Sequence, residues 1–146
     1  MEDLDVATQE CLRQFNAGFS CAEAVFLVGC ERIGVDSDLI PRVATAFGGG
    51  LSRSKSMCGA LAGAAMVLSV KYGRSVPSDD RTALVARVQE LVADFRSNFG
   101  SEGCYDITGL DFNTPEGQAE YRGRVHTEVC TNVVAFCLRR ALELCD

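Results

Sequence analysis

Residues 47–63 read FGGGLSRSKSMCGALAG, and the rest of the chain is interpreted around this stretch. Its three consecutive glycines, Gly48 to Gly50, allow positive φ angles or a close approach to a neighbouring segment. Ser56 can cap the helix that follows, which puts Cys58 in the first turn of that helix. The stretch therefore predicts a cysteine presented at a helix N-terminus.

A cysteine in that position has the surroundings of a reactive thiolate. Helix N-termini carry unpaired amides and a partial positive charge, which stabilise a thiolate relative to a thiol. Arg53 and Lys55 add positive charge just before Cys58. We expect Cys58 to have a low pKa. The glycines could instead suggest a phosphate loop, but the stretch lacks the Walker spacing and a preceding strand, so nucleotide binding is disfavoured.

Apolar residues recur at intervals of three and four along most of the chain, which predicts helices. No segment alternates with the period of two expected for a strand. Gly59, Ala60, Gly63 and Ala64 give the central helix a face of small side chains, which would let another helix come close. We predict an all-α fold, a compact single-domain bundle of five to seven helices. Cap and stop signals place them over residues 4–15, 21–33, 39–47, 57–72, 79–99 and from 115 onward, with a bend at Gly123.

Composition and charge set the class of protein. The 146 residues suffice for one domain, 1–146, and 47% of them are hydrophobic. A net charge of −6 argues against a nucleic acid partner. The acidic N-terminus is unlike a secretory signal, and no apolar run approaches the ~20 residues of a membrane span. We expect a cytoplasmic protein that does not contact the membrane.

The chain has eight cysteines, and in a reducing compartment such a number usually indicates metal binding or thiol chemistry. Cys21 also lies at a helix start, since Ser20 and Glu23 form a capping box around it. No Cys-x-x-Cys occurs, so the local signal for a metal is weak. Four cysteines on four separate segments could still hold zinc or an iron–sulfur cluster. Some of the eight are expected to be packed as small hydrophobic residues.

The single histidine, His126, lies four residues before Cys130, which places both on one face of the last helix. Its imidazolium form would lower the pKa of the cysteine, and its neutral form could accept the thiol proton. The alternative is a solvated histidine without a role. Cys137, two turns further on, could be a resolving thiol or a packed side chain. Cys104 is expected in a loop.

Several motifs together resemble the family named for the pattern C-GCAxxG-C-C, whose members are described as redox-active. The resemblance covers nearly the whole chain. It implies four family cysteines, which fall on Cys21, Cys58, Cys104 and Cys130, and it leaves Cys11, Cys30, Cys137 and Cys145 as extras. The run Ser52 to Met57 departs from the shorter, glycine-rich approach of the family. The matching pieces are FSCAEAV (19–25), FGGG (47–50), CGALAG (58–63), FGSEGC (99–104), TPEG (114–117) and Cys130.

These observations lead to three functional hypotheses. In the first, Cys58 exchanges thiol for disulfide with Cys21, Cys104 or Cys130, which would make the protein a thiol–disulfide oxidoreductase with a separate redox partner. In the second, the four cysteines ligate an iron–sulfur cluster or zinc, and the protein carries electrons. In the third, the cysteines are packed and the domain is a scaffold. The amphipathic helices leave a homodimer open.

Overall fold

A computed structural model describes residues 2–146 as an all-α fold, as the sequence predicts. Strands are absent from these residues, and one isolated antiparallel bridge joins Met57 to Gly103. In chain order the elements are α1 (Glu2–Asn16), α2 (Cys21–Arg32), the 3₁₀ helix η1 (Arg42–Phe47), α3 (Gly48–Arg53), α4 (Gly59–Tyr72), α5 (Thr82–Phe99), α6 (Cys104–Thr108), α7 (Pro115–Glu120), the π-helix η2 (Tyr121–Cys130) and α8 (Thr131–Leu144).

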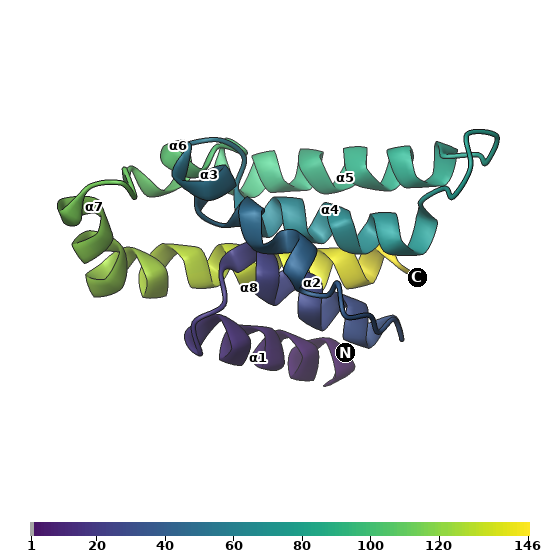
Figure 1. Cartoon of the computed structure of the whole chain (residues 1–146), viewed down its shortest axis with the longest axis horizontal. Coiled ribbons are helices and arrows are strands. Elements are labelled where there is room, and N and C mark those ends of the chain that lie inside the picture. Colours follow the sequence, from purple (N-terminus) through teal and green to yellow (C-terminus); the bar gives the residue numbers. More distant parts are fainter. Residues whose placement is uncertain (1) are drawn as a thin grey trace.

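The long helices pack around α4 and α8 (Figure 1). α2 lies against α4, α1 crosses both α2 and α8, and α5 contacts α4 and α8 from the other side. The short elements α3, α6 and α7 gather at one end of the molecule, on the left in Figure 1. α7, η2 and α8 follow one another without a break: α7 runs at an angle at that end, and η2 and α8 continue from it across the molecule to the C-terminus.

The small-residue face of α4 brings α2 close, as predicted. A Cβ added at Gly63 would lie 2.8 Å from the carbonyl oxygen of Ala22. On the facing helix, a Cβ added at Gly29 would lie 2.4 Å from a methyl group of Val67. Such distances are too short for a side chain, so only glycine permits this separation of the two helices. The start of α2 is thereby held against the start of α4.

Three predicted helix boundaries are wrong. The 39–47 helix is a 3₁₀ helix that begins only at Arg42. The helix predicted from residue 79 begins at Thr82, because the carboxylate of Asp80 accepts hydrogen bonds from the Thr82 amide and hydroxyl in a turn before it. The helix predicted from residue 57 begins at Gly59, with Cys58 in the N-cap position. The bend predicted at Gly123 is a ten-residue π-helix.

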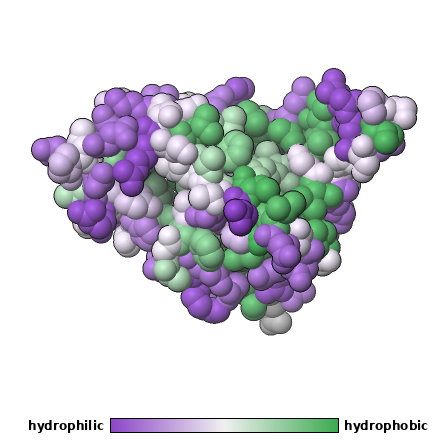
Figure 2. Space-filling model, viewed as in Figure 1, coloured by the Kyte–Doolittle hydropathy of each residue, from purple (hydrophilic) through white to green (hydrophobic). Residues whose placement is uncertain are grey.

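The surface has separate apolar and hydrophilic regions (Figure 2). On the face shown, apolar residues gather over the middle, where α2 and α4 lie, and hydrophilic residues cover α1 and the end with α7. Within residues 2–146, none of the helices combines the length and the hydropathy needed to cross a membrane.

Candidate functional site

Cys21 is the first residue of α2, and the predicted capping box fixes this helix start. The Ser20 hydroxyl accepts a hydrogen bond from the Glu23 amide at 3.2 Å, and the Glu23 carboxylate accepts one from the Ser20 amide at 3.0 Å. The start of α4 lies directly against Cys21, since a Cβ added at Gly59 would be 2.6 Å from its sulfur. Gly59 therefore makes room for the sulfur of Cys21.

Cys58 and Cys104 are brought together by the antiparallel bridge between Met57 and Gly103. The Cys58 amide donates to the Glu102 carbonyl at 2.7 Å, and the Cys104 amide donates to the Ser56 carbonyl at 2.8 Å. In this pattern both cysteines point to the same face, as diagonal neighbours with Cα atoms roughly 7–8 Å apart. The bridge also explains why α4 starts late, because residues 56–58 are extended to pair with residues 102–104.

The glycine run forms a left-handed turn beside these cysteines. Residues 49–53 all have φ between 54° and 69°. Gly50 also approaches Cys104 closely, since an added Cβ would lie 2.6 Å from the Cβ of that cysteine. This conformation costs about 1–2 kcal/mol at each of the non-glycine residues Leu51, Ser52 and Arg53. Strained backbone of this kind persists only where surrounding contacts enforce it.

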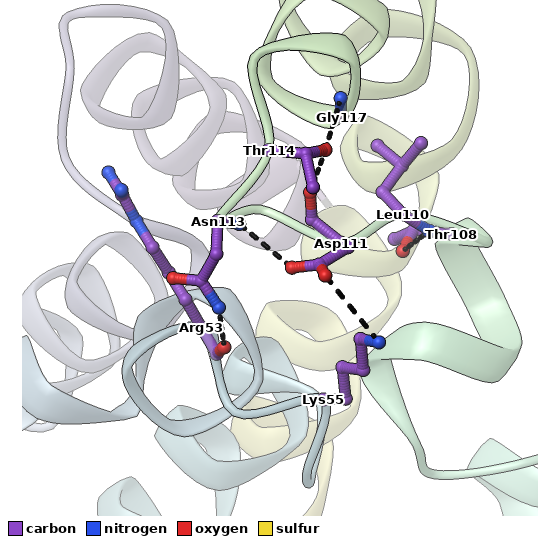
Figure 3. A network of polar contacts seen from close by, with 8 residues as sticks. All are labelled: Arg53, Lys55, Thr108, Leu110, Asp111, Asn113, Thr114 and Gly117. Carbon is purple, nitrogen blue, oxygen red and sulfur yellow. Dashed lines mark hydrogen bonds and ion pairs between the residues drawn. The ribbon is translucent and has the colours of Figure 1, made fainter.

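Polar contacts to the loop before α7 enforce the turn (Figure 3). The Asn113 side-chain amide donates to the Arg53 carbonyl at 2.9 Å, and the Lys55 ammonium lies 3.6 Å from a carboxylate oxygen of Asp111. Asp111 also accepts a hydrogen bond from the Asn113 amide at 2.9 Å. Within the turn, the Ser52 hydroxyl donates to the Ala46 carbonyl at 2.8 Å. The charge of Lys55 is therefore directed to Asp111, and the pKa of that carboxyl is lowered first by the Asn113 backbone amide and then by Lys55.

The π-helix η2 brings Cys130 and Tyr121 to one face. Nine residues of an α-helix, at about 100° per residue, would put these two side chains on opposite faces. A π-helix has ~4.4 residues per turn, so the same nine residues differ by only about 20°. The hydrogen bond from the Thr131 amide to the His126 carbonyl has the i to i+5 spacing of such a helix. Periodicity in the sequence could not reveal this pairing, because it presumes an α-helix.

His126 packs between two aromatic rings. Its ring stacks on that of Phe15 with centroids 4.0 Å apart and an interplanar angle of 9°, and Tyr121 meets it edge-on at 5.3 Å. Phe112 in turn packs edge-on against Tyr121 at 5.1 Å. His126 thus belongs to an aromatic wall. It is half-buried there, so its ring is packed on Phe15 and only partly solvated.

Cys21, Cys58, Cys104 and Cys130 all line one cavity of about 830 Å³. They come from the start of α2, the N-cap of α4, the start of α6 and the end of η2, so four segments far apart in the sequence contribute one cysteine each. Cys104 begins a short helix, where a loop was predicted. The same cavity is lined by the aromatic wall and by Glu23, Arg53 and Arg122.

The predicted low pKa of Cys58 is wrong. Burial raises its pKa to about 12, the nearby charge of Cys21 adds to this, and the amides at the start of α4 only partly oppose it. Burial likewise raises the pKa of Cys104 to about 11 and that of Cys130 further, with Cys21 the next largest cause in both. Cys21 shows the same competition: burial raises its pKa, although the backbone amides of Gly49, Ala22 and Ala60 lower it.

Cys21 is the neighbour that the other three cavity cysteines have in common. Its charge acts on each of the other three cavity cysteines. It also acts on Tyr121, whose pKa is raised by burial first and then by Cys130, Cys21 and Cys104. The pKa of Cys58 is not lowered by Arg53 or Lys55, which were predicted to stabilise its thiolate. Burial therefore favours the protonated thiol at all four positions.

The remaining four cysteines lie in the hydrophobic core. Cys11, Cys30 and Cys137 are fully buried, and Cys145 is 4% exposed. None of them lines the cavity. They fill core space as small hydrophobic side chains, as expected for some of the eight.

Residues 19–144 match the model of a protein family described as "Putative redox-active protein (C-GCAxxG-C-C)". The chain belongs to this family. The matched range, residues 19–144, includes all four cavity cysteines, whereas Cys11 and Cys145 lie outside it. No curated protein and no solved structure matches the chain.

In this member of the C-GCAxxG-C-C family, the cavity is also lined by residues that were not predicted from the sequence. Phe15, Phe112, Tyr121 and Arg122 line the space beside the cysteines. The sequence carried no usable signal for Tyr121, which lies in the predicted last helix nine residues before Cys130. On an α-helical pattern that spacing points away from the cysteine.

Proposed function

We propose that the cavity performs thiol–disulfide exchange, with Cys58 forming a disulfide with Cys21 or Cys104 and with Cys130 also within the group. The observation that carries the proposal is that four cysteines from four segments line one cavity. Cys58 adjoins two of them: Gly59, the next residue, touches the Cys21 sulfur, and the bridge holds Cys104 on the same face. A disulfide needs Cα atoms within about 7 Å, so a bond to Cys104, whose Cα lies at roughly 7–8 Å as a diagonal neighbour, requires a small backbone shift.

The raised pKa values suggest the direction of the exchange. Low thiol pKa values stabilise the reduced form and make a protein oxidising. Here burial works against the thiolate, so the reduced site keeps both protons and lacks that stabilisation. The pair is therefore expected to act as a reductant. Each electron pair that it gives up leaves together with two protons.

The test is reversible oxidation followed by disulfide mapping. Reduced protein treated with a mild disulfide oxidant is expected to lose two of its eight free thiols and to regain them with a reductant. Peptide mapping should find Cys58 joined to Cys21 or Cys104. Cys58→Ala should abolish the loss, whereas Cys30→Ala, which also removes a buried thiol but lies outside the cavity, should not. A count that stays at eight, or a disulfide between core cysteines, would overturn the proposal.

A second candidate is a four-cysteine iron–sulfur cluster or zinc site. Four thiolates are a suitable donor set, and a bound cation would reverse the mutual rise in pKa of the cavity cysteines. The positions fit less well: across residues 2–146, no three or more cysteine, histidine or carboxylate side chains are grouped so that they could hold a metal ion. Iron, sulfide and zinc analysis of anaerobically purified protein distinguishes the candidates. One metal site per chain would favour the second.

A further inference from the structure

The cysteine cavity has the dimensions of a small-molecule site. Its volume of about 830 Å³ falls within the roughly 300–1,000 Å³ of ligand pockets. Cys58 and Cys104 are each only 8% exposed, so their sulfurs lie inside this concave space. A disulfide on the surface of a folded protein could not reach them without opening the cavity. A small disulfide could enter.

The cavity also has uncommitted positive charge. Arg53 and Arg122 line it with exposed side chains, and neither guanidinium makes an ion pair or hydrogen bond with any of residues 2–146. Glu23 is the one carboxylate in the lining, and it already accepts hydrogen bonds from the Ser20 amide and from the Thr45 hydroxyl at 3.0 Å. In a chain with a net charge of −6, the cavity lining thus carries a net charge of +1.

The position of Arg53 is fixed by the strained turn. Its φ of 65° belongs to the left-handed segment, and its carbonyl is held by the Asn113 side chain (Figure 3). The loop contacts that hold the turn engage the Arg53 backbone and leave its guanidinium unpaired. Guanidinium groups bind carboxylates through two parallel hydrogen bonds, so two of them suit a ligand with more than one carboxylate.

We propose, resting on the thiol–disulfide function above, that the substrate is a small-molecule disulfide that bears carboxylates, with Arg53 and Arg122 binding its anionic groups. A cavity cysteine attacks one substrate sulfur, the substrate S–S bond breaks, and the leaving thiolate takes up the proton lost by that cysteine. A second cavity cysteine then attacks the mixed disulfide. It releases the other half of the substrate as a thiol and leaves a disulfide in the protein. Two electrons and two protons pass to the substrate.

The experiment compares three disulfides of different charge in single-turnover oxidation of fully reduced protein. The probes are dianionic 3,3′-dithiodipropionate, neutral 2-hydroxyethyl disulfide and dicationic cystamine, and the readout is the rate of protein thiol loss. We expect the dianion to react about tenfold faster than the neutral probe at low salt, and cystamine to be slowest. The preference should shrink at high ionic strength, where the charges are screened.

Single substitutions identify the charges that cause the preference for the dianionic disulfide. Arg53→Gln and Arg122→Gln should each lower the ratio of the dianion rate to the neutral rate several-fold. Arg32→Gln makes the same change in net charge at an exposed residue outside the cavity, and it should leave the ratio unchanged. Equal rates for the three probes, or a ratio that neither cavity variant alters, would overturn the substrate class while leaving the exchange function intact. If no probe produces a protein disulfide, the exchange function itself fails.

Discussion

The reactivity of Cys58 toward an alkylating agent should depend steeply on pH up to an unusually high value. Burial and the neighbouring Cys21 raise its pKa from an ordinary 9.0 to about 12. At pH 8 the thiolate fraction is then lower by roughly three orders of magnitude than for an ordinary cysteine. Between pH 8 and pH 10 the rate should rise about 100-fold, whereas a thiol of pKa 9.0 would gain only about tenfold over the same range.

The assay is anaerobic alkylation with iodoacetamide, with the label on each cysteine measured by peptide mass spectrometry. Limited access lowers the rate by the same factor at every pH, so the slope reports the pKa separately from burial. The same chain unfolded in urea is the control, and its Cys58 rate should reach half of its maximum near pH 9. Circular dichroism should confirm that the folded protein keeps its helices over the range. A folded-state rate that reaches half of its maximum at or below pH 9 would refute the argument that burial dominates over the helix amides.

Three further perturbations test other parts of the structure. Gly59→Ala places a Cβ 2.6 Å from the sulfur of Cys21. The resulting overpacking costs about 1–3 kcal/mol, more than the roughly 1 kcal/mol gained in helix propensity. The variant should therefore have a lower free energy of unfolding in urea. Gly123→Ala, which meets open space, should be neutral or stabilising. Asn113→Ala removes the hydrogen bond to the Arg53 carbonyl, worth about 1 kcal/mol, and should speed tryptic cleavage after residues 53 and 55. The cavity thiols have folded pKa values above their ordinary values, so their contribution to stability is complete below pH 9 and is lost as pH rises from 9 toward 12. The urea midpoint should therefore fall between pH 8 and pH 10, and less so in Cys21→Ala.

Each of these has a clear contrary result. A Gly59→Ala protein as stable as Gly123→Ala would mean that the start of α4 does not press on the Cys21 sulfur. Unchanged tryptic cleavage in Asn113→Ala would mean that the left-handed turn does not depend on its contact with the loop before α7. A urea midpoint that is flat to pH 10 would mean that the cavity thiols are not desolvated in the folded state.

The sequence by itself determined most of the helical fold. Periodicity and cap residues located the long helices, and the Ser20–Glu23 capping box put Cys21 at a helix start. The face of α4 that carries Gly59 and Gly63 predicted the close approach of another helix, which proves to be α2. These features depend on residues near one another in the chain, so local patterns are enough to predict them.

Only the tertiary structure decided the character of the site. The low pKa predicted for Cys58 followed from the local helix start, but the actual pKa follows from burial and from Cys21, which comes from a distant segment. The late start of α4 depends on the pairing of Met57 with Gly103, and the common face of Tyr121 and Cys130 depends on a π-helix. Desolvation and mutual charge are properties of the assembled cavity, and no short stretch of sequence contains them.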